Sequence, residues 1–263
     1  MSIKHISFRS SISMICGILI FSGFTFNNTI NLLIDEPIYG NLTTSQKVRY
    51  KKDATRLALR MIADNDEYQS HEPIVPDNMV NSIYSALVAV HRSELEEAQL
   101  VTRIHKLHTF PVPAVDKFLV VYERNIPWAR SLRLGDNRTE SDEINKFCDQ
   151  YGLLIDSSLE WDEEHNSMNI RALEALNVAS VAEKFLEFEG VTKVDIMIPN
   201  GDGNDIEITK TNKGWEINYM IKFDACFTQC KKQRNWKFGV SEEGDVSFIE
   251  VSGDSLPKWM AKH

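Results

Sequence analysis

The stretch GWEINYMIKFD, residues 214–224, decides the fold that this sequence predicts. Apolar and polar residues alternate along it with a period of two, which is typical of a β-strand with one buried face. The side chains expected to point inward are Trp215, Ile217, Tyr219, Ile221 and Phe223. Those expected to point outward are Glu216, Asn218, Met220, Lys222 and Asp224. One face of this strand should therefore lie on an apolar core.

Shorter alternating runs flank this strand on both sides. They contain apolar residues at Ile206, Ile208, Trp236, Phe238, Val240, Val246, Phe248 and Val251. Glycine-containing pieces typical of turns separate the runs: GDGND, TNKG and SEEGD. Residues 199–263 are therefore predicted to form an antiparallel β-meander.

The residues before the meander, 115–198, have an order typical of the ferredoxin-like fold. Strands are expected at 117–123, 153–161, 168–173 and 191–198, and helices at 140–152 and 178–189. The order is strand–helix–strand–strand–helix–strand, the split βαβ arrangement, and right-handed crossovers fit it without long connections. Ser141 and Asn177 are the expected N-caps of the two helices, and Gly190 has the position of a C-cap after the second. The meander either extends this sheet or forms a second one, and the sequence leaves both alternatives open.

The N-terminal part, residues 29–110, is expected to be a lead-in followed by helices at 45–63, 77–90 and 93–105. Val48, Ala54 and Leu57 recur at helical spacing in the first of these.

Two caps and a linker set the boundaries of this helical region. Asp77 follows Pro76 as an expected N-cap, and Ser93 forms an S-x-x-E capping box with Glu96. The prolines of HTFPVPAV (108–115) exclude a continuing helix, so a compact α+β body is expected to begin at Val115. The predicted fold class is α+β: an N-terminal helical segment, then a ferredoxin-like β-α-β-β-α-β unit continued by a C-terminal antiparallel β-meander.

The first residues carry an export pattern. Lys4 and Arg9 precede the apolar run Ile12–Phe26, as in a secretory signal peptide. The run is shorter than the roughly 20 residues of a membrane span. Residues 1–28 are therefore predicted to be a signal peptide, with an uncleaved anchor as the alternative. The expected location is the periplasm, the extracellular space or the cell envelope.

The composition narrows the functional class. The chain has 263 residues, of which 43% are hydrophobic and 25% charged, as in ordinary globular proteins. The formal net charge of −9 argues against sequence-independent nucleic-acid binding and against docking on anionic lipid. Contact with a membrane is expected only through an uncleaved N-terminal segment.

Three cysteines follow the predicted signal peptide: Cys148, Cys226 and Cys230. The last two are four residues apart in a connection between strands, where one tight turn can join their sulfurs. An oxidising compartment would preserve such a disulfide, and two free thiols are the alternative. Cys148 lies among the apolar positions of a predicted helix and is expected to be buried and reduced.

Sites for catalysis, metals or cofactors are weakly indicated. Asp202, Asn204 and Asp205 in GDGND resemble part of a calcium loop, but the later positions of that pattern do not follow, which favours a turn. The pair His105 and His108 lacks a third metal ligand marked by spacing, and DEEH (162–165) is typical of a charged hairpin tip. The sequence contains no G-x-S-x-G, H-E-x-x-H or glycine-rich phosphate loop, so no catalytic residue and no cofactor is predicted.

These observations favour a non-catalytic binding protein of the cell envelope or secreted fraction, with a protein or an envelope component as its partner. A ferredoxin-like unit behind a signal peptide resembles, in fold alone, the prodomains and inhibitors of secreted subtilisin-type proteases. That resemblance implies a stand-alone inhibitor, since no protease domain follows. An enzyme whose site is dispersed along the chain is the third hypothesis.

Overall fold

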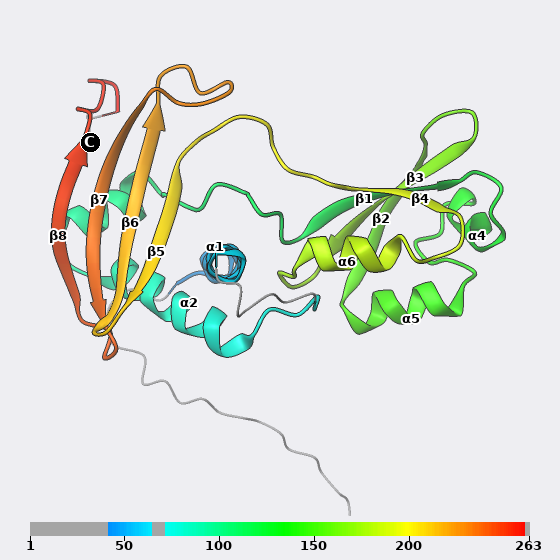
Figure 1. Ribbon diagram of the computed structural model, residues 1–263, viewed down its shortest axis with the longest axis horizontal. Helices are drawn as coiled ribbons and strands as arrows, with labels where there is room; N and C mark the ends of the chain where they lie inside the picture. Colours follow the sequence, from blue (N-terminus) through cyan, green and yellow to red (C-terminus); the bar gives the residue numbers. More distant parts are fainter. Residues whose placement is uncertain (1–41, 65–71, 261–263) are drawn as a thin grey trace, which may run out of the picture. The chain divides into compact units, whose positions relative to one another are not determined.

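The computed structural model describes residues 42–64 and 72–260. They form helices and two separate four-stranded antiparallel sheets, so the predicted α+β class is confirmed (Figure 1). The predicted signal peptide and most of the lead-in lie outside the described residues. Within the described ranges, no helix is both long and apolar enough to cross a bilayer.

The first sheet belongs to the predicted ferredoxin-like unit. Its strands are β1 (Lys117–Glu123), β2 (Leu153–Glu160), β3 (His165–Ala172) and β4 (Val191–Ile196). Their spatial order is β2-β3-β1-β4, and every neighbouring pair is antiparallel. The first strand therefore lies between the third and the last, as the split βαβ arrangement requires.

Two helices, α5 (Asp142–Gln150) and α6 (Val178–Phe185), cover one face of this sheet (Figure 1). Phe118 of β1 packs edge-to-face on Phe185 of α6, with ring centroids 5.4 Å apart. The predicted cap of α5 is confirmed, because the Ser141 hydroxyl accepts a hydrogen bond from the Ile144 N–H. Apolar burial between helices and sheet thus accounts for this layer arrangement.

Three details of this unit differ from the prediction. Helix α6 ends at Phe185, so Gly190 is not its C-cap but lies in the turn before β4, with φ of 76°. The Asn177 side chain makes no capping hydrogen bond to α6. Two short helices, η3 (Pro127–Ala129) and α4 (Arg130–Arg133), have no counterpart in the prediction because their four or fewer residues show no periodicity.

The meander forms a second sheet, which answers the question that the sequence left open. Its strands are β5 (Asp205–Thr211), β6 (Gly214–Phe223), β7 (Lys232–Ser241) and β8 (Val246–Gly253). They pair in sequence order, and the β6–β7 ladder runs from Gly214 opposite Ser241 to Phe223 opposite Lys232. All five side chains expected to point inward from β6 are buried.

Helices α1 (Thr44–Ala63) and α2 (Asp77–Arg92) cover the apolar face of this second sheet (Figure 1). One apolar cluster joins Leu57 of α1 and Ile83 of α2 to Tyr219 and Phe238 of the sheet. A different cluster fills the ferredoxin-like unit. That a compact body begins at Val115 stays a prediction, and a chain starting there would leave the apolar face of the meander without the cover of α1 and α2.

The N-terminal helices also begin and end differently from the prediction. Thr43 caps α1 in a capping box with Gln46, and Pro76, not Asp77, precedes the first residue of α2. Ser93 ends α2 and accepts the Leu95 N–H, so it forms no capping box. The predicted third helix is short α3 (Glu96–Gln99) followed by the π-helical η2 (Leu100–Ile104).

Two apolar side chains depart from the expected burial. Val48, counted on the buried stripe of α1, is 52% exposed, because that stripe instead runs through Tyr50, Ala54 and Leu57. Met220 lies on the outward face of β6 but is only 3% exposed. The alternation of apolar residues therefore predicts the face of a strand better than the burial of each member.

We expect Ile221→Ala to lower the free energy of unfolding by about 2–5 kcal/mol, because it removes buried aliphatic atoms from the second core. Glu216→Ala, on the exposed face of the same strand, should change it by less than about 0.5 kcal/mol. Lys222 is a poor control, since its ammonium lies 3.0 Å from Asp202. Urea denaturation measures both variants, and equal losses would contradict the register of β6.

Candidate functional site

The connection between β6 and β7, residues 224–231, is the candidate functional site and is called here the bridged loop. The predicted disulfide joins Cys226 to Cys230, whose Cα atoms are 4.0 Å apart. Asp224 and Ala225 enter the loop with positive φ of 66° and 57°. At its base, the Lys231 N–H donates to the Asp224 carbonyl at 2.8 Å, which closes the loop directly above the β6–β7 ladder.

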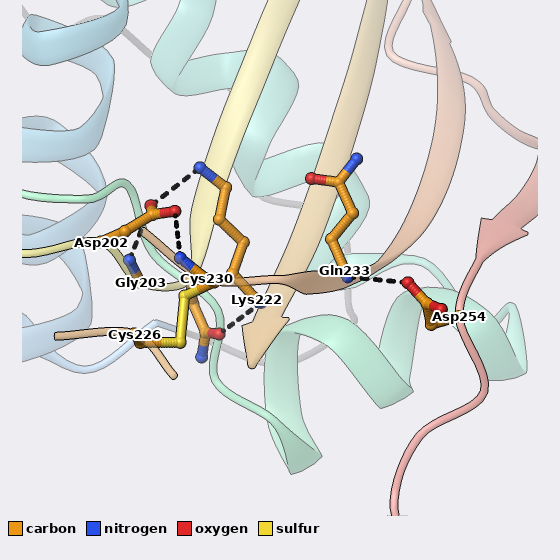
Figure 2. The surroundings of a disulfide bond; sticks show 8 residues. Asp202, Gly203, Lys222, Cys226, Cys230, Gln233 and Asp254 are labelled. Atoms are coloured by element: carbon orange, nitrogen blue, oxygen red, sulfur yellow. Dashed lines mark hydrogen bonds and ion pairs between the residues drawn. A yellow bond between two sulfur atoms is a disulfide. The ribbon is translucent and has the colours of Figure 1, made fainter. Parts of the chain in front are cut away.

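Asp202 fastens the bridged loop to the segment before β5 (Figure 2). Its carboxylate accepts hydrogen bonds from the Lys222 ammonium at 3.0 Å and from the Cys230 N–H at 3.2 Å. It also accepts the Gly203 N–H at 2.8 Å, and the Asp202 N–H points to the Cys226 carbonyl at 3.4 Å. One aspartate thus contacts both cysteines of the bridge through their backbones.

The protonation state of Asp202 is set by these donors. Burial by itself would raise the pKa of the carboxyl, but the bonds from Lys222, Cys230 and Gly203 outweigh it and leave the pKa below its usual value. Gly201 makes the close approach feasible, since a Cβ there would lie 3.0 Å from the Cys226 and Phe227 carbonyl oxygens. Its φ of 97° also favours glycine.

Phe227 projects from the tip of the bridged loop and is 92% exposed, the largest exposed fraction among the large apolar side chains described. Within the described part of the chain, the side chains of Thr228 and Gln229 form no hydrogen bond or ion pair. The bridge closes so short a loop that it removes little chain entropy, about 2 kcal/mol at most. Its main effect is therefore on the shape of the loop.

The weak metal candidates have other hydrogen-bonding roles. Besides the bonds of Asp202, the Asn204 side-chain oxygen accepts the Lys222 N–H at 3.1 Å. Asp205 accepts the Phe110 N–H at 2.7 Å and pairs with the Arg60 guanidinium at 3.1 Å. Residues 42–64 and 72–260 contain no group of three or more histidine, cysteine or acidic side chains arranged for a metal.

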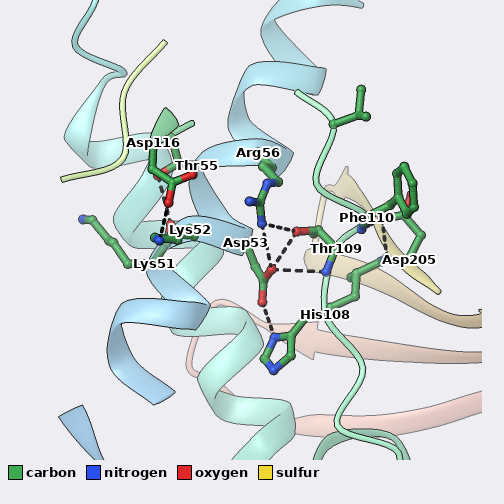
Figure 3. Close-up of polar contacts among 12 residues, drawn as sticks. Lys51, Lys52, Asp53, Thr55, Arg56, His108, Thr109, Phe110, Asp116 and Asp205 are labelled. Carbon is green, nitrogen blue, oxygen red and sulfur yellow. Dashed lines mark hydrogen bonds and ion pairs between the residues drawn. The ribbon is translucent and has the colours of Figure 1, made fainter. Parts of the chain in front are cut away.

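A buried polar cluster lies between α1 and the 105–110 segment, centred on Asp53, whose side chain is fully buried (Figure 3). The Nδ1 atom of His108 is 2.5 Å from the Asp53 Oδ2. The Thr109 N–H and hydroxyl donate to the Asp53 Oδ1 at 3.1 and 2.6 Å. The Arg56 Nη1 lies 3.7 Å from the same oxygen. This arrangement satisfies a buried carboxylate, as burial of a charge requires.

A second pair extends the cluster toward α2. The Tyr50 hydroxyl is 2.9 Å from the His91 Nδ1, and the Tyr50 and His108 rings are 5.4 Å apart. The pKa of His91 is lowered, first by burial and then by the positive charges of Arg103, Arg92 and His108.

The Asp53–His108 pair resembles half of an acid–base site, but the described residues around it do not complete one. The pockets of 440, 550 and 290 Å³ on the surface include neither residue in their lining. No serine or cysteine is hydrogen-bonded to His108 among the described residues. The contacts instead join α1 to the 105–110 segment, which indicates a structural role.

The other predicted candidates lie apart from one another. The His105 ring lies 6.1 Å from the Trp236 ring, while His108 contacts Asp53, so the two histidines face different neighbours. Asp162 accepts the N–H groups of Glu164 and His165 and forms the β2–β3 turn. Cys148 is buried and free, and burial raises the pKa of its thiol to about 11.

Comparison with known proteins adds no relative: no family model, curated protein or solved structure matches this chain.

Sequence reasoning found the disulfide but missed the roles of Asp202 and Asp53. The sequence predicts Asp202 only as a weak metal ligand, because its partners Lys222 and Cys230 are 20 and 28 residues away. Asp53 did carry a signal, since it lies on the apolar stripe of α1 between Tyr50 and Leu57. A lone carboxylate on such a stripe predicts a buried, paired charge.

We expect Asp53→Ala to lower the free energy of unfolding by about 3–5 kcal/mol, the cost of leaving buried partners of a charge unpaired. Asp149→Ala is the matched control, because that carboxylate pairs with Arg138 on an exposed surface and should matter far less. Urea denaturation compares the two. A small change in the free energy of unfolding of Asp53→Ala would contradict a stabilising role for the buried cluster.

Acid should destabilise this region through His91. Its pKa is below the usual value in the folded chain, so the unfolded chain binds more protons as the pH falls below about 6.5. The free energy of unfolding should therefore be highest above that pH and decline below it. Asn at position 91 can accept the Tyr50 hydroxyl but does not titrate, so His91→Asn should reduce the loss between pH 7.5 and 5.5. His165→Asn is the control, and an unchanged loss in His91→Asn would contradict the argument.

Proposed function

We propose that this chain is an exported, non-catalytic binding protein and that the bridged loop holds a protein partner. The observation that carries the proposal is the exposed Phe227 on a loop closed by a disulfide. Large exposed aromatic side chains act as anchors in protein interfaces when they enter a pocket on the partner. Phe227 has this geometry in the free chain.

The fixed shape of the bridged loop supports the same function. Binding costs conformational entropy when a loop must become ordered, and a closed loop has lost part of that entropy beforehand. The bridge, the bonds of Asp202 and the Lys231–Asp224 bond each limit the movement of the loop ends. Affinity is therefore gained by presenting Phe227 in few conformations.

The expected partner is a protein with an apolar pocket for one aromatic ring and acidic groups at the rim. Lys231 and Lys232 follow the bridge and are exposed, so residues 224–232 carry one net positive charge although the whole chain carries a formal charge of −9. Lys232 is paired with Asp224 at 3.4 Å. Lys231 is the cation that remains for a carboxylate on the partner.

Two features of the chain, its N-terminal sequence and its disulfide, support export. Lys4, Arg9 and the apolar run 12–26 have the pattern of a signal peptide. A disulfide persists in compartments outside the reducing cytosol. The inhibitor hypothesis rests on the ferredoxin-like strand order alone, and fold alone does not determine function.

The test uses a photo-crosslinking phenylalanine analogue at position 227 of the full chain, expressed in its source organism. We expect a covalent adduct with one protein in the exported fraction. The same analogue at Leu134, which is 78% exposed in the ferredoxin-like unit, is the control for accessibility. Phe227→Ala should lower the affinity for the captured, purified partner at least tenfold, about 1.4 kcal/mol. No adduct at position 227, equal adducts at both positions, or a cytosolic adduct would contradict the proposal.

A further inference from the structure

We infer that the Cys226–Cys230 disulfide is a reversible redox control of the bridged loop. Oxidation holds Phe227 in its binding conformation, and reduction by a dithiol releases the loop tip while the rest of the chain stays folded. The loss of binding on reduction rests on the function proposed above. The release of the loop does not, and it has its own measurement.

The fold below the loop does not depend on the bridge. The β6–β7 ladder continues to Phe223 opposite Lys232, and the Lys231 N–H closes it on the Asp224 carbonyl. Phe223 is 7% exposed and lies in the apolar core shared with the helices. All these contacts are independent of the two sulfur atoms.

The loop tip, in contrast, depends on the bridge. Its ends are held at the Cys226 carbonyl and the Cys230 N–H, both by Asp202. Between these points, the side chains of Phe227, Thr228 and Gln229 have no hydrogen bond or ion pair within the described residues. Once the sulfurs separate, the loop ends keep the hydrogen bonds of Asp202 and the Lys231–Asp224 bond, but the covalent restraint on the tip that carries Phe227 is lost.

The disulfide is placed for exchange with an external reductant. Cys226 and Cys230 are half-buried, and the three residues between them are exposed, so a thiolate can reach a sulfur. The thiolate of a dithiol attacks one sulfur, the S–S bond breaks and a mixed disulfide forms. The second thiol of the reductant then displaces the chain. Two electrons and two protons pass to Cys226 and Cys230, which become thiols, and the reductant becomes a disulfide. Cys148 is buried, with only 5% of its surface exposed, and takes no part in this exchange.

The first test follows the loop without any partner. The full chain is treated with dithiothreitol under native conditions, and Cys226→Ser/Cys230→Ser serves as a permanently open form. We expect both to unfold within a few degrees of the oxidised chain and to be cut by chymotrypsin after Phe227 at least tenfold faster. A disulfide that resists reduction until the chain unfolds, or a cutting rate that reduction leaves unchanged, overturns the inference. A large fall in the melting temperature on reduction shows that the disulfide is needed to hold the fold, and this also overturns the inference.

The second test measures binding by the adduct at position 227. The yield should fall at least tenfold in dithiothreitol and recover after reoxidation. The Cys148→Ser chain is the control and should respond as the wild type does. A faster cut with an unchanged adduct yield overturns the redox control but leaves the binding function in place. An adduct missing in the oxidised chain overturns the binding function, and the cutting rate still decides whether the loop is released.

Discussion

The structure depends on the burial of one sheet face by helices from the other end of the chain. Strands β5 to β8 present Tyr219, Ile221 and Phe238 on a single face, and this face is stable only when it is removed from water. Helices α1 and α2 supply the cover, although the whole ferredoxin-like unit separates them from β5 in sequence. Arg60 of α1 strengthens the connection by pairing with Asp205 at the start of β5. The first and last parts of the described chain therefore make one core.

The polar cluster around Asp53 follows from that core. A carboxylate on the inner stripe of a covering helix cannot reach water, so its negative charge has to be satisfied by neighbouring donors. His108 and Thr109 provide them, and this holds the 105–110 segment against α1. The catalytic appearance of an aspartate beside a histidine has a structural cause here. The cluster is expected to affect stability through Asp53 and acid sensitivity through His91.

The candidate binding site lies at the end of a hairpin whose strands belong to the same core. The sheet fixes where the loop begins and ends, whereas the disulfide and Asp202 fix its shape. Stability and the proposed binding therefore depend on different bonds. The lost entropy of the unfolded chain is small for so short a loop, so the bridge matters mainly for the conformation of Phe227. The proposed redox control of the bridged loop requires this separation.

The sequence by itself determined the local features. The period of two in residues 214–224, the order of segments in 115–198 and the spacing of Cys226 and Cys230 each arise from interactions between near neighbours. Only the tertiary structure decided which surface covers the meander, because an apolar strand face is equally compatible with a sheet or with helices. It also decided the roles of Asp202 and Asp53, since a carboxylate can bind a metal, a lysine or a backbone N–H. The partners Lys222 and Cys230 of Asp202, and His108 and Thr109 of Asp53, are 20 or more residues away in sequence, and only folding brings them within hydrogen-bond distance.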